Sequence, residues 1–251
     1  MRSTLAAVGL AAAMMIQGLA PAHAESFDAG QQQEIRDIVR AYLLEHPEVI
    51  VEAIQVLQDR QEAAEAEHAK GQIAELRDKI LRDARDPVIG NPVGDVTLVE
   101  FFDYRCGYCK QAQPIVMELI KADPKVRVVL KEFPILGPDS VLASHAALAA
   151  VGQDKYREFH EALIASRGAL PEDKIMAIAG SVGLDTDRLK KDMASPAIAG
   201  HIDDVKALAQ DLGINGTPGF IIGDTLVPGV VDLATLQKLV DEARKTCTDA
   251  C

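Results

Sequence analysis

The sequence of 251 residues contains no tryptophan, only 4% aromatic residues and only four cysteines. Four cysteines are too few for a fold held together by disulfides, and a chain of this length can bury a core without them. Basic residues are also scarce, because 26 lysines and arginines stand against 38 acidic residues and the formal net charge is −12. An acidic chain of this kind is a poor ligand for nucleic acid or for anionic membrane surfaces, so we expect neither as a partner.

Long apolar runs are absent except at the N-terminus. Arg2 gives that segment a positive start, residues 5–20 are apolar, and Ala22-His23-Ala24 has the pattern of a signal-peptidase site. A membrane anchor is the alternative, but the run is shorter than the roughly 20 residues that a spanning helix needs. We expect a signal peptide over residues 1–24, cleavage after Ala24, export, and no membrane insertion afterwards. Loss of Arg2 changes the formal charge from −12 to −13, since residues 1–24 contain no acid.

Residues 25–85 are predicted to be helical. Apolar residues line one face of a helix over 29–45, and a second helix follows the break at His46-Pro47. Residues 59–83 are polar, with apolar residues at alternating three- and four-residue steps, as in a coiled coil. These seam residues are Ala66, Ala69, Ile73, Leu76 and Ile80. A short helical pair cannot bury so much apolar surface. We therefore expect a helical oligomerisation arm over 25–85, with homo-oligomer contacts over 27–85; packing onto its own domain is the alternative.

Proline and glycine at residues 86–92 mark a boundary, and residues 86–251 are predicted to form a second domain. A buried strand over 96–102, a helix over 106–121 and a strand over 126–133 form a βαβ unit, which implies a parallel strand pair. A helical insertion over about 138–212 comes next. Its expected helices cover 140–151, 155–165, 171–182, 187–193 and 198–212. A β-hairpin over 220–227 and a helix over 233–244 complete the domain, so the fold class is α/β.

Cys106 and Cys109 open the helix that follows the buried strand. Neighbours three apart on a helix lie roughly 5–6 Å from each other, which suits a disulfide. The free N–H groups of a helix N-terminus stabilise a thiolate on the first cysteine. A purely structural disulfide in so short a loop would contribute only about 2 kcal/mol. The pair therefore predicts a redox-active dithiol, with Cys106 as the exposed nucleophile and Cys109 as the shielded resolving thiol.

Other interpretations of the two cysteines fit less well. A zinc site shared with Cys247 and Cys251 would require reduced thiols outside the cytosol. A cysteine hydrolase would need a histidine beside Cys106, but His145 and His160 lie on predicted helices without a recognisable signature. Loss of activity in a degenerate domain is disfavoured because both cysteines are present.

The order of elements resembles the thioredoxin fold with a helical insertion, and in particular the DsbA-like periplasmic thiol-disulfide oxidoreductases. Three segments carry this resemblance: Val99-Glu100-Phe101-Phe102 before the Cys106-Gly107-Tyr108-Cys109 motif, Lys131-Glu132-Phe133-Pro134 up to Gly137, and Gly216-Thr217-Pro218. Residues 38–48 of the arm further resemble the N-terminal domain of ScsC-type proteins. Together these resemblances cover nearly all of the chain after residue 24.

The resemblance implies roles for individual residues. Thr217-Pro218 should be a cis bond facing the dithiol, next to backbone that pairs with an extended substrate. Gly107 and Tyr108 should tune the dithiol, and Glu100 and Lys131 should form a buried charged pair from which Glu100 relays protons to Cys109. No cofactor or metal is implied. The terminal Cys247 and Cys251 depart from the family pattern. An internal structural disulfide is the expectation there, and copper or a partner thiol the alternative.

The resemblance also implies a function. We expect a periplasmic enzyme that acts on exported cysteine-containing proteins and exchanges electrons with a membrane redox partner. The Gly-Tyr pair between the cysteines and the threonine before the proline resemble the active site of disulfide isomerases. Together with the arm, they favour an oligomeric isomerase or reductase. The alternatives are a monomeric dithiol oxidase and, outside the enzymes, a copper-binding or copper-stress protein.

Overall fold

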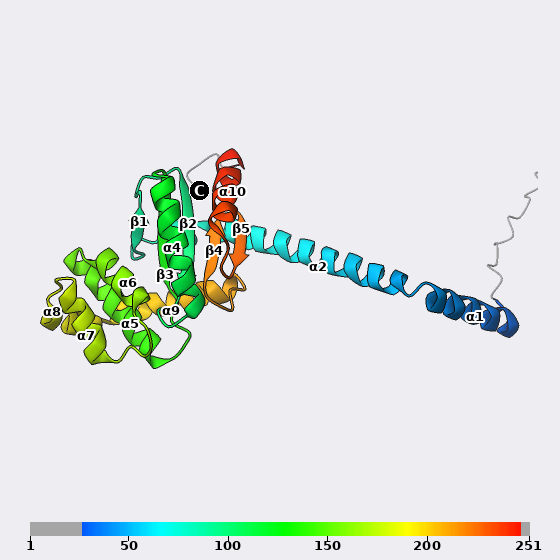
Figure 1. The fold of residues 1–251 in the computed structure, drawn as a ribbon, viewed down its shortest axis with the longest axis horizontal. Helices are drawn as coiled ribbons and strands as arrows, with labels where there is room; N and C mark the ends of the chain where they lie inside the picture. Colours follow the sequence, from blue (N-terminus) through cyan, green and yellow to red (C-terminus); the bar gives the residue numbers. More distant parts are fainter. Residues whose placement is uncertain (1–26, 247–251) are drawn as a thin grey trace, which may run out of the picture. The chain divides into compact units, whose positions relative to one another are not determined.

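The computed structural model describes residues 27–246 (Figure 1). The expected signal peptide over 1–24 and the cysteine pair Cys247 and Cys251 therefore lie outside the described residues. Within 27–246, no helix combines the length and the apolar character that crossing a membrane demands. The chain divides into two compact units, residues 1–58 and residues 59–251.

The first unit contains α1 (Ala29–Glu45) and the beginning of α2 (Glu48–Glu75). Asp28 caps α1, because its side chain accepts from the backbone N–H of Gln31 while the Gln31 side chain accepts from the Asp28 N–H. No residue of α1 is buried. Large apolar side chains instead remain exposed by 41–71% along both helices: Ile35, Ile38, Val39, Tyr42, Leu44, Ile50, Val51, Ile54, Val56 and Leu57.

The second unit holds the sheet and the remaining helices. The strands are β1 (Val88–Gly90), β2 (Val96–Phe102), β3 (Val126–Glu132), β4 (Gly219–Ile222) and β5 (Thr225–Pro228). The helices are α3 (Arg77–Leu81), α4 (Gly107–Ala122), α5 (Pro138–Ala150), α6 (Tyr156–Ala165), α7 (Glu172–Ser181), α8 (Thr186–Met193), α9 (Pro196–Asp211) and α10 (Leu233–Thr246), with a 3₁₀ turn, η1 (Val151–Gln153), after α5.

The sheet has the order β1-β3-β2-β4-β5 and is mixed. The central pair, β2 and β3, is parallel, as the βαβ pattern predicts, and the other pairs are antiparallel. β1 was not expected, since turn residues surround its three-residue length. Gly90 ends it with φ +76°, and a Cβ at this position would lie 2.8 Å from the carbonyl oxygen of Val126.

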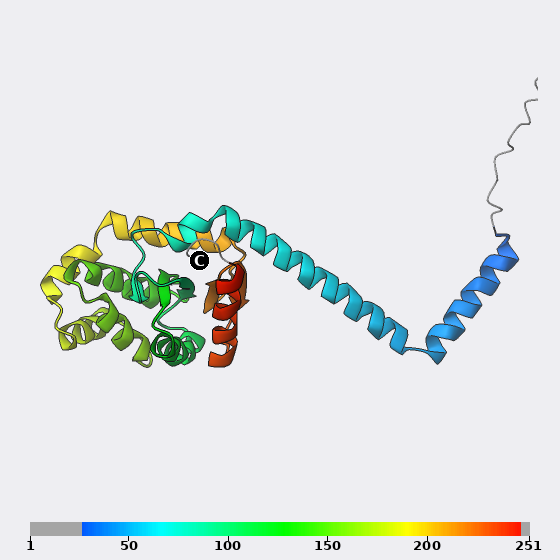
Figure 2. The same ribbon diagram turned by 90° about the horizontal axis from the view of Figure 1, so that it is seen from above.

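Helices cover both faces of the sheet, so every residue of β2 is buried. On one face, α4 and α10 pack over strand residues such as Val96, Leu98 and Phe102, and this core continues into the helical insertion. On the other face, α3 and α9 pack over Val99 and Phe101. The edge-on view in Figure 2 shows α9 on one side of the sheet and α4 with α10 on the other. The α/β thioredoxin-like fold with a helical insertion is thus confirmed.

The end of the predicted arm belongs to the second unit. Ile73 and Ile80, two of the predicted seam residues, are 5% and 0% exposed and pack with Val99 and Phe101 of the sheet. Leu76 is partly buried against the same cluster. For this half of the seam, the alternative prediction, packing onto its own domain, is confirmed. The helix expected over 59–83 also differs from the structure, in which α2 ends at Glu75 and the separate helix α3 follows.

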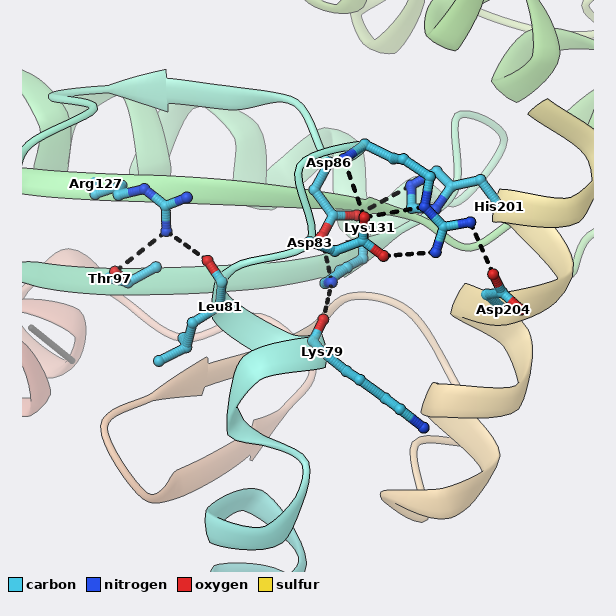
Figure 3. Close-up of polar contacts among 10 residues, drawn as sticks. Lys79, Leu81, Asp83, Asp86, Thr97, Arg127, Lys131, His201 and Asp204 are labelled. Carbon is cyan, nitrogen blue, oxygen red and sulfur yellow. Dashed lines mark hydrogen bonds and ion pairs between the residues drawn. The ribbon is translucent and has the colours of Figure 1, made fainter. Parts of the chain in front are cut away.

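A buried cluster of charged groups fastens the segment after α3 to the sheet and to α9 (Figure 3). Lys131 of β3 forms an ion pair with Asp86 and also donates to the carbonyl of Lys79 at 2.6 Å. His201 of α9 lies 3.1 Å from the other oxygen of Asp86. The side chains of Asp86, Lys131 and His201 are only 1–3% exposed. Burial lowers the pKa of Lys131, and Asp86 partly offsets that effect.

Removal of Asp86 tests how much this cluster stabilises the second unit. Asp86→Ala leaves Lys131 charged and without its carboxylate, so the free energy of unfolding should fall by about 3–5 kcal/mol. Denaturant unfolding followed by circular dichroism measures the change. The matched control, Glu161→Ala, breaks the exposed Arg157–Glu161 pair and should cost no more than about 0.5 kcal/mol. Equal losses of unfolding free energy in the two variants would show that the buried pair stabilises the protein no more than an exposed pair does.

Candidate active site

The two cysteines of the motif lie at the N-terminus of α4 with unequal access. Cys106 is the N-cap residue, in extended conformation, and Cys109 is one turn inside the helix. Both are free thiols. Cys109 is 1% exposed, as expected of a shielded resolving thiol. Cys106 is only 6% exposed, so the prediction of an exposed nucleophile was wrong. Its neighbours Arg105, Gly107 and Tyr108 are exposed, and Tyr108 is 64% accessible.

Asp103, which the sequence did not single out, organises the backbone around the motif. Its buried carboxylate accepts from the N–H of Arg105 at 2.7 Å, from the N–H groups of Ile135 and Leu136 at 2.9 and 3.0 Å, and from Ser140 Oγ at 2.8 Å. Arg105 adds a bond from Nη1 to the carbonyl of Leu136. The loop before α5 is therefore tied to the segment that leads into Cys106.

The loop before the hairpin faces the dithiol. The Thr217–Pro218 peptide bond is cis, as the resemblance implies. Cys106 Sγ donates to the carbonyl oxygen of Thr217 at 3.1 Å, so residues 111 positions apart in the sequence meet here. A groove beside this loop is lined by residues 213–219 together with Leu226, Pro228 and Gly229.

Glu100 lies on the α4 side of the sheet without the expected partner. In the parallel register Glu100 is opposite Leu130, whereas Lys131 is opposite Phe101 and therefore points to the other face. The predicted Glu100–Lys131 pair is wrong, because Lys131 pairs with Asp86 instead. Glu100 is 2% exposed, and its Oε2 is among the buried oxygens of the described residues that lack a hydrogen-bond donor. Burial raises the pKa of Glu100 to about 8.

Cys109 and Lys110 are also affected by burial. Burial above all, with the nearby Glu100 carboxyl and Cys106, raises the pKa of the Cys109 thiol well above its ordinary value. Lys110 is half-buried, which lowers the pKa of its ammonium group. Its Nζ donates to the carbonyls of Ile164 and Ser166 at 3.0 and 2.7 Å and so ties α4 to the end of α6. Of these features, only the burial of Cys109 was predicted.

A second buried carboxyl, Glu132 at the end of β3, was not predicted to have a role. Its oxygens accept from Tyr104, Tyr156 and Ser144 at 2.7–2.9 Å. Burial raises the pKa of Glu132 to about 8 even though these three hydroxyls lower it. His160 lies 3.1 Å from Tyr104 Oη, and burial lowers the pKa of His160 to about 3.

The histidines considered for a hydrolase are occupied elsewhere. His160 binds Tyr104 and Gln113, and His145 Nδ1 lies 3.0 Å from the carbonyl of Met193. Among residues 27–246, no group of three or more histidine, cysteine or acidic side chains is arranged to hold a metal ion. The site thus presents two buried thiols, of which Cys106 is flanked by exposed residues, and a buried carboxyl near Cys109.

Comparison with known proteins identifies the family. A family model described as a DSBA-like thioredoxin domain matches residues 97–241, and one described as the copper resistance protein ScsC N-terminal domain matches residues 31–64. The first match covers more than half of the 251 residues. The chain therefore belongs to the DSBA-like thioredoxin domain family, the family of the DsbA-type thiol-disulfide oxidoreductases.

Solved structures agree with this assignment. A thioredoxin-like oxidoreductase from Silicibacter pomeroyi DSS-3 is 51% identical, with a TM-score of 0.67 over 68% of this chain and 99% of that one. A linker-deletion variant of Proteus mirabilis ScsC is 29% identical, with a TM-score of 0.68 over 90% of this chain and 100% of that one. The second alignment extends well beyond the thioredoxin-like domain.

Among curated relatives, the thiol:disulfide interchange protein DsbA of Bordetella pertussis is 28% identical over 165 residues, or 62% of this chain and 78% of that protein. The chain also matches the Na(+)/H(+) antiporter NhaA 3 of Salinispora tropica at 32% identity over 161 residues, or 63% of this chain. It spans only 25% of the length of that antiporter.

The raised pKa of Glu100 predicts a dependence of stability on pH. Between pH 4.5 and about 8, folded Glu100 keeps a proton that the unfolded chain has released. The free energy of unfolding should therefore fall as pH rises through this interval, by up to about 1.4 kcal/mol per pH unit for this one group. Glu100→Gln removes that contribution, so the variant should gain stability relative to the wild type as pH rises from 5 to 8.

Denaturant unfolding of the reduced protein at several pH values measures this difference. The control is Glu118→Gln, which changes an exposed carboxyl of α4. It should leave the slope of the unfolding free energy against pH unchanged. Parallel pH curves for wild type and Glu100→Gln would contradict the buried-acid assignment.

Proposed function

We propose that this protein is a periplasmic thiol-disulfide oxidoreductase that acts on exported cysteine-containing proteins, and that it works as an oligomeric disulfide isomerase or reductase. The observation that carries the proposal is the placement of Cys106. This thiol caps a helix, lies 3.1 Å from the Thr217 carbonyl, and has the more deeply buried Cys109 one turn away. We further propose that residues 1–24 are the export signal and are cleaved after Ala24.

In the first step the Cys106 thiolate attacks one sulfur of a client disulfide. A bond forms between Cys106 and that sulfur, the client S–S bond breaks, and the other client sulfur leaves as a thiolate that takes a proton from water. The unpaired N–H groups and the positive dipole end of α4 favour the attacking thiolate. The exposed residues around Cys106 allow a client to approach, although the sulfur itself is mostly covered.

In the second step Cys109 resolves the mixed disulfide. The Cys109 thiol gives its proton to the Glu100 carboxylate and attacks Cys106; the bond from Cys106 to the client breaks, and the client thiolate is released. This step leaves the enzyme oxidised and the client reduced by two electrons. Glu100 suits the task because burial raises its pKa to about 8 and its Oε2 accepts no hydrogen bond from residues 27–246. An isomerase cycle instead ends when a second client thiol displaces Cys106.

The groove beside Thr217 offers a place for the client chain. The carbonyl of Thr217 faces Cys106, and the groove continues along residues 213–219. An extended client segment that pairs with this backbone would bring its cysteine to Cys106, while its side chains would have little sequence-specific contact. Such binding suits clients that share an exposed cysteine rather than a sequence motif. Gly107 and Tyr108 are proposed to tune the dithiol from between the cysteines.

The arm supports the oligomeric form of the proposal. Apolar side chains of α1 and the first part of α2 are 41–71% exposed, and several of them recur at three- and four-residue steps, which is the spacing of a helix-packing face. A second copy of the same helices would cover them. Several dithiols facing one client would favour reshuffling of its disulfides. A monomer, acting as a dithiol oxidase with a membrane partner that recharges it, is the alternative.

A copper-binding function is the non-enzymatic alternative, because the N-terminal match is to a domain of a copper resistance protein. Residues 31–64 contain His46 but no cysteine or methionine, so this region lacks the soft ligands that copper(I) prefers. Copper binding would therefore depend on Cys106 and Cys109 or on the terminal Cys247 and Cys251. Unchanged copper affinity in Cys106→Ser would exclude the dithiol as the copper site.

The two cysteines should respond differently to substitution. Cys106→Ser should lower exchange with a client disulfide by at least about tenfold, since serine cannot provide a thiolate. Cys109→Ser should still attack but should accumulate mixed disulfides with clients, detectable by mass spectrometry of acid-quenched reactions. Equal accumulation in both variants, or turnover by Cys106→Ser, would contradict the assigned order of attack.

The oligomer prediction is tested in the full chain. Ile38→Glu combined with Ile54→Glu places charge on the exposed apolar residues and should reduce the mass found by light scattering to that of one chain. Reactivation of a client with scrambled disulfides should then fall several-fold, whereas simple reduction of a small disulfide should not change. Gln32→Glu with Gln61→Glu, on exposed polar positions, is the control. A monomeric wild type would remove the main support for isomerase activity.

A further inference from the structure

Glu132 is a buried acid that takes no part in the proposed thiol-disulfide steps. It is 0% exposed and ends β3. Tyr104 and Tyr156 both donate to its Oε1 at 2.9 Å, and Ser144 donates to its Oε2 at 2.7 Å. Within residues 27–246 no lysine or arginine forms an ion pair with it. Burial disfavours the charged form of this carboxyl, and the three hydroxyl donors offset that effect only in part.

Glu132 bonds to the segment before the dithiol directly and reaches the segment after it through Tyr104 and His160. Tyr104, two residues before Cys106, bonds to Glu132 and lies 3.1 Å from His160 Nδ1. The other ring nitrogen of His160 lies 3.2 Å from Oε1 of Gln113, which is four residues after Cys109 on α4. One chain of contacts thus runs from the end of β3 through α6 to both sides of the motif.

Glu132 also neighbours the proposed proton acceptor. Glu132 pairs with Phe102 and Glu100 with Leu130, so the two acids are diagonal neighbours on the same face of the parallel strands. Both are almost fully buried, and Tyr156, which donates to Glu132, also experiences the charge of Glu100. Two carboxyls so placed oppose each other's ionisation.

Building on the proposed disulfide chemistry, we propose that Glu132 is a positioning residue for the dithiol: it holds the segment before Cys106 directly and the segment after Cys109 through Tyr104 and His160, and its negative charge opposes the ionisation of Glu100. Glu100 can take the Cys109 proton only as a carboxylate. Glu132 therefore sets the pH at which the resolving step becomes fast. It touches neither client nor sulfur and acts through Glu100 and the backbone.

Other titratable groups near Glu132 lie on several elements. Tyr104 and Asp103 come from the loop after β2, Tyr156 and His160 from α6, and Glu100 from β2. Asp103 already accepts four hydrogen bonds, three from backbone N–H groups and one from Ser140. Burial lowers the pKa of His160 to about 3 and raises those of both tyrosines, so these three groups stay neutral near pH 7. Glu100 and Glu132, whose pKa values burial raises to about 8, titrate in the working range.

The test is the pH profile of the resolving step in the full chain. Cys106 is loaded with glutathione as a mixed disulfide, and the rate of glutathione release by Cys109 is followed from pH 5 to 10. Glu132→Gln keeps the shape of the side chain and removes its charge. The midpoint of the profile should move down by about one pH unit, which is about tenfold faster release at a fixed pH below the midpoint. In a Glu100→Gln background, Glu132→Gln should have no further effect on the midpoint.

Two results would overturn the proposal. One is an unmoved midpoint in a Glu132→Gln variant whose tyrosine near-ultraviolet circular dichroism is native; the other is a shift that persists without Glu100. If Glu132→Gln does not fold, Ser144→Ala replaces it. This variant removes one donor from the carboxylate, disfavours its charge, and should give a smaller downward shift; no shift would again refute the proposal. Failure of the wild type to form or release the glutathione adduct would instead refute the proposed function.

Discussion

The parallel pairing of β2 with β3 is the constraint on which the rest of the second unit depends. Side chains alternate between the faces of each strand, so one register assigns every residue of both strands to one side or the other. Glu100 and Glu132 are placed toward α4 and the dithiol, and Lys131 is placed toward α3 and α9. A shift of one residue in β3 would exchange these environments and bury a lysine beside the thiols.

The two faces of the sheet differ in how their buried charged groups are compensated. Toward α3 and α9, Lys131 has a carboxylate, a carbonyl and a nearby imidazole, and the cluster fastens the segment after α3 to the sheet. Toward α4, and among residues 27–246, the Oε2 of Glu100 accepts no hydrogen bond and the donors to Glu132 are all hydroxyl groups. A paired buried charge keeps its ionisation state over a wide pH range, whereas an unpaired carboxyl shifts its pKa toward neutrality. The first arrangement suits structure, and the second suits proton transfer.

Much of this architecture could be predicted from the sequence, and the failures have physical causes. The apolar run of β2, the helix after Cys106 and the hairpin over 220–227 follow from local patterns that their surroundings reinforce. The error in the Glu100–Lys131 pair could not be found from local patterns. Whether these two side chains share a face depends on the register of two strands that are separated by a whole helix. β1 is too short for periodicity to detect. The role of Asp103 requires knowing that residues 135 and 136 return to the end of β2.

The predicted seam shows how one periodic pattern can serve two purposes. Ile73 and Ile80 fill the core under the sheet, while apolar residues with similar spacing earlier in the helices, such as Ile38 and Ile54, are 61% and 50% exposed. Each large apolar side chain left in water forgoes about 1.5–3 kcal/mol of burial energy, so a row of them is stable only if something covers it or if function requires it. Periodicity predicts that a helix face will be buried, but it does not predict which surface will cover that face. The boundary between the two units, near residue 58, separates the exposed apolar residues from those that pack under the sheet.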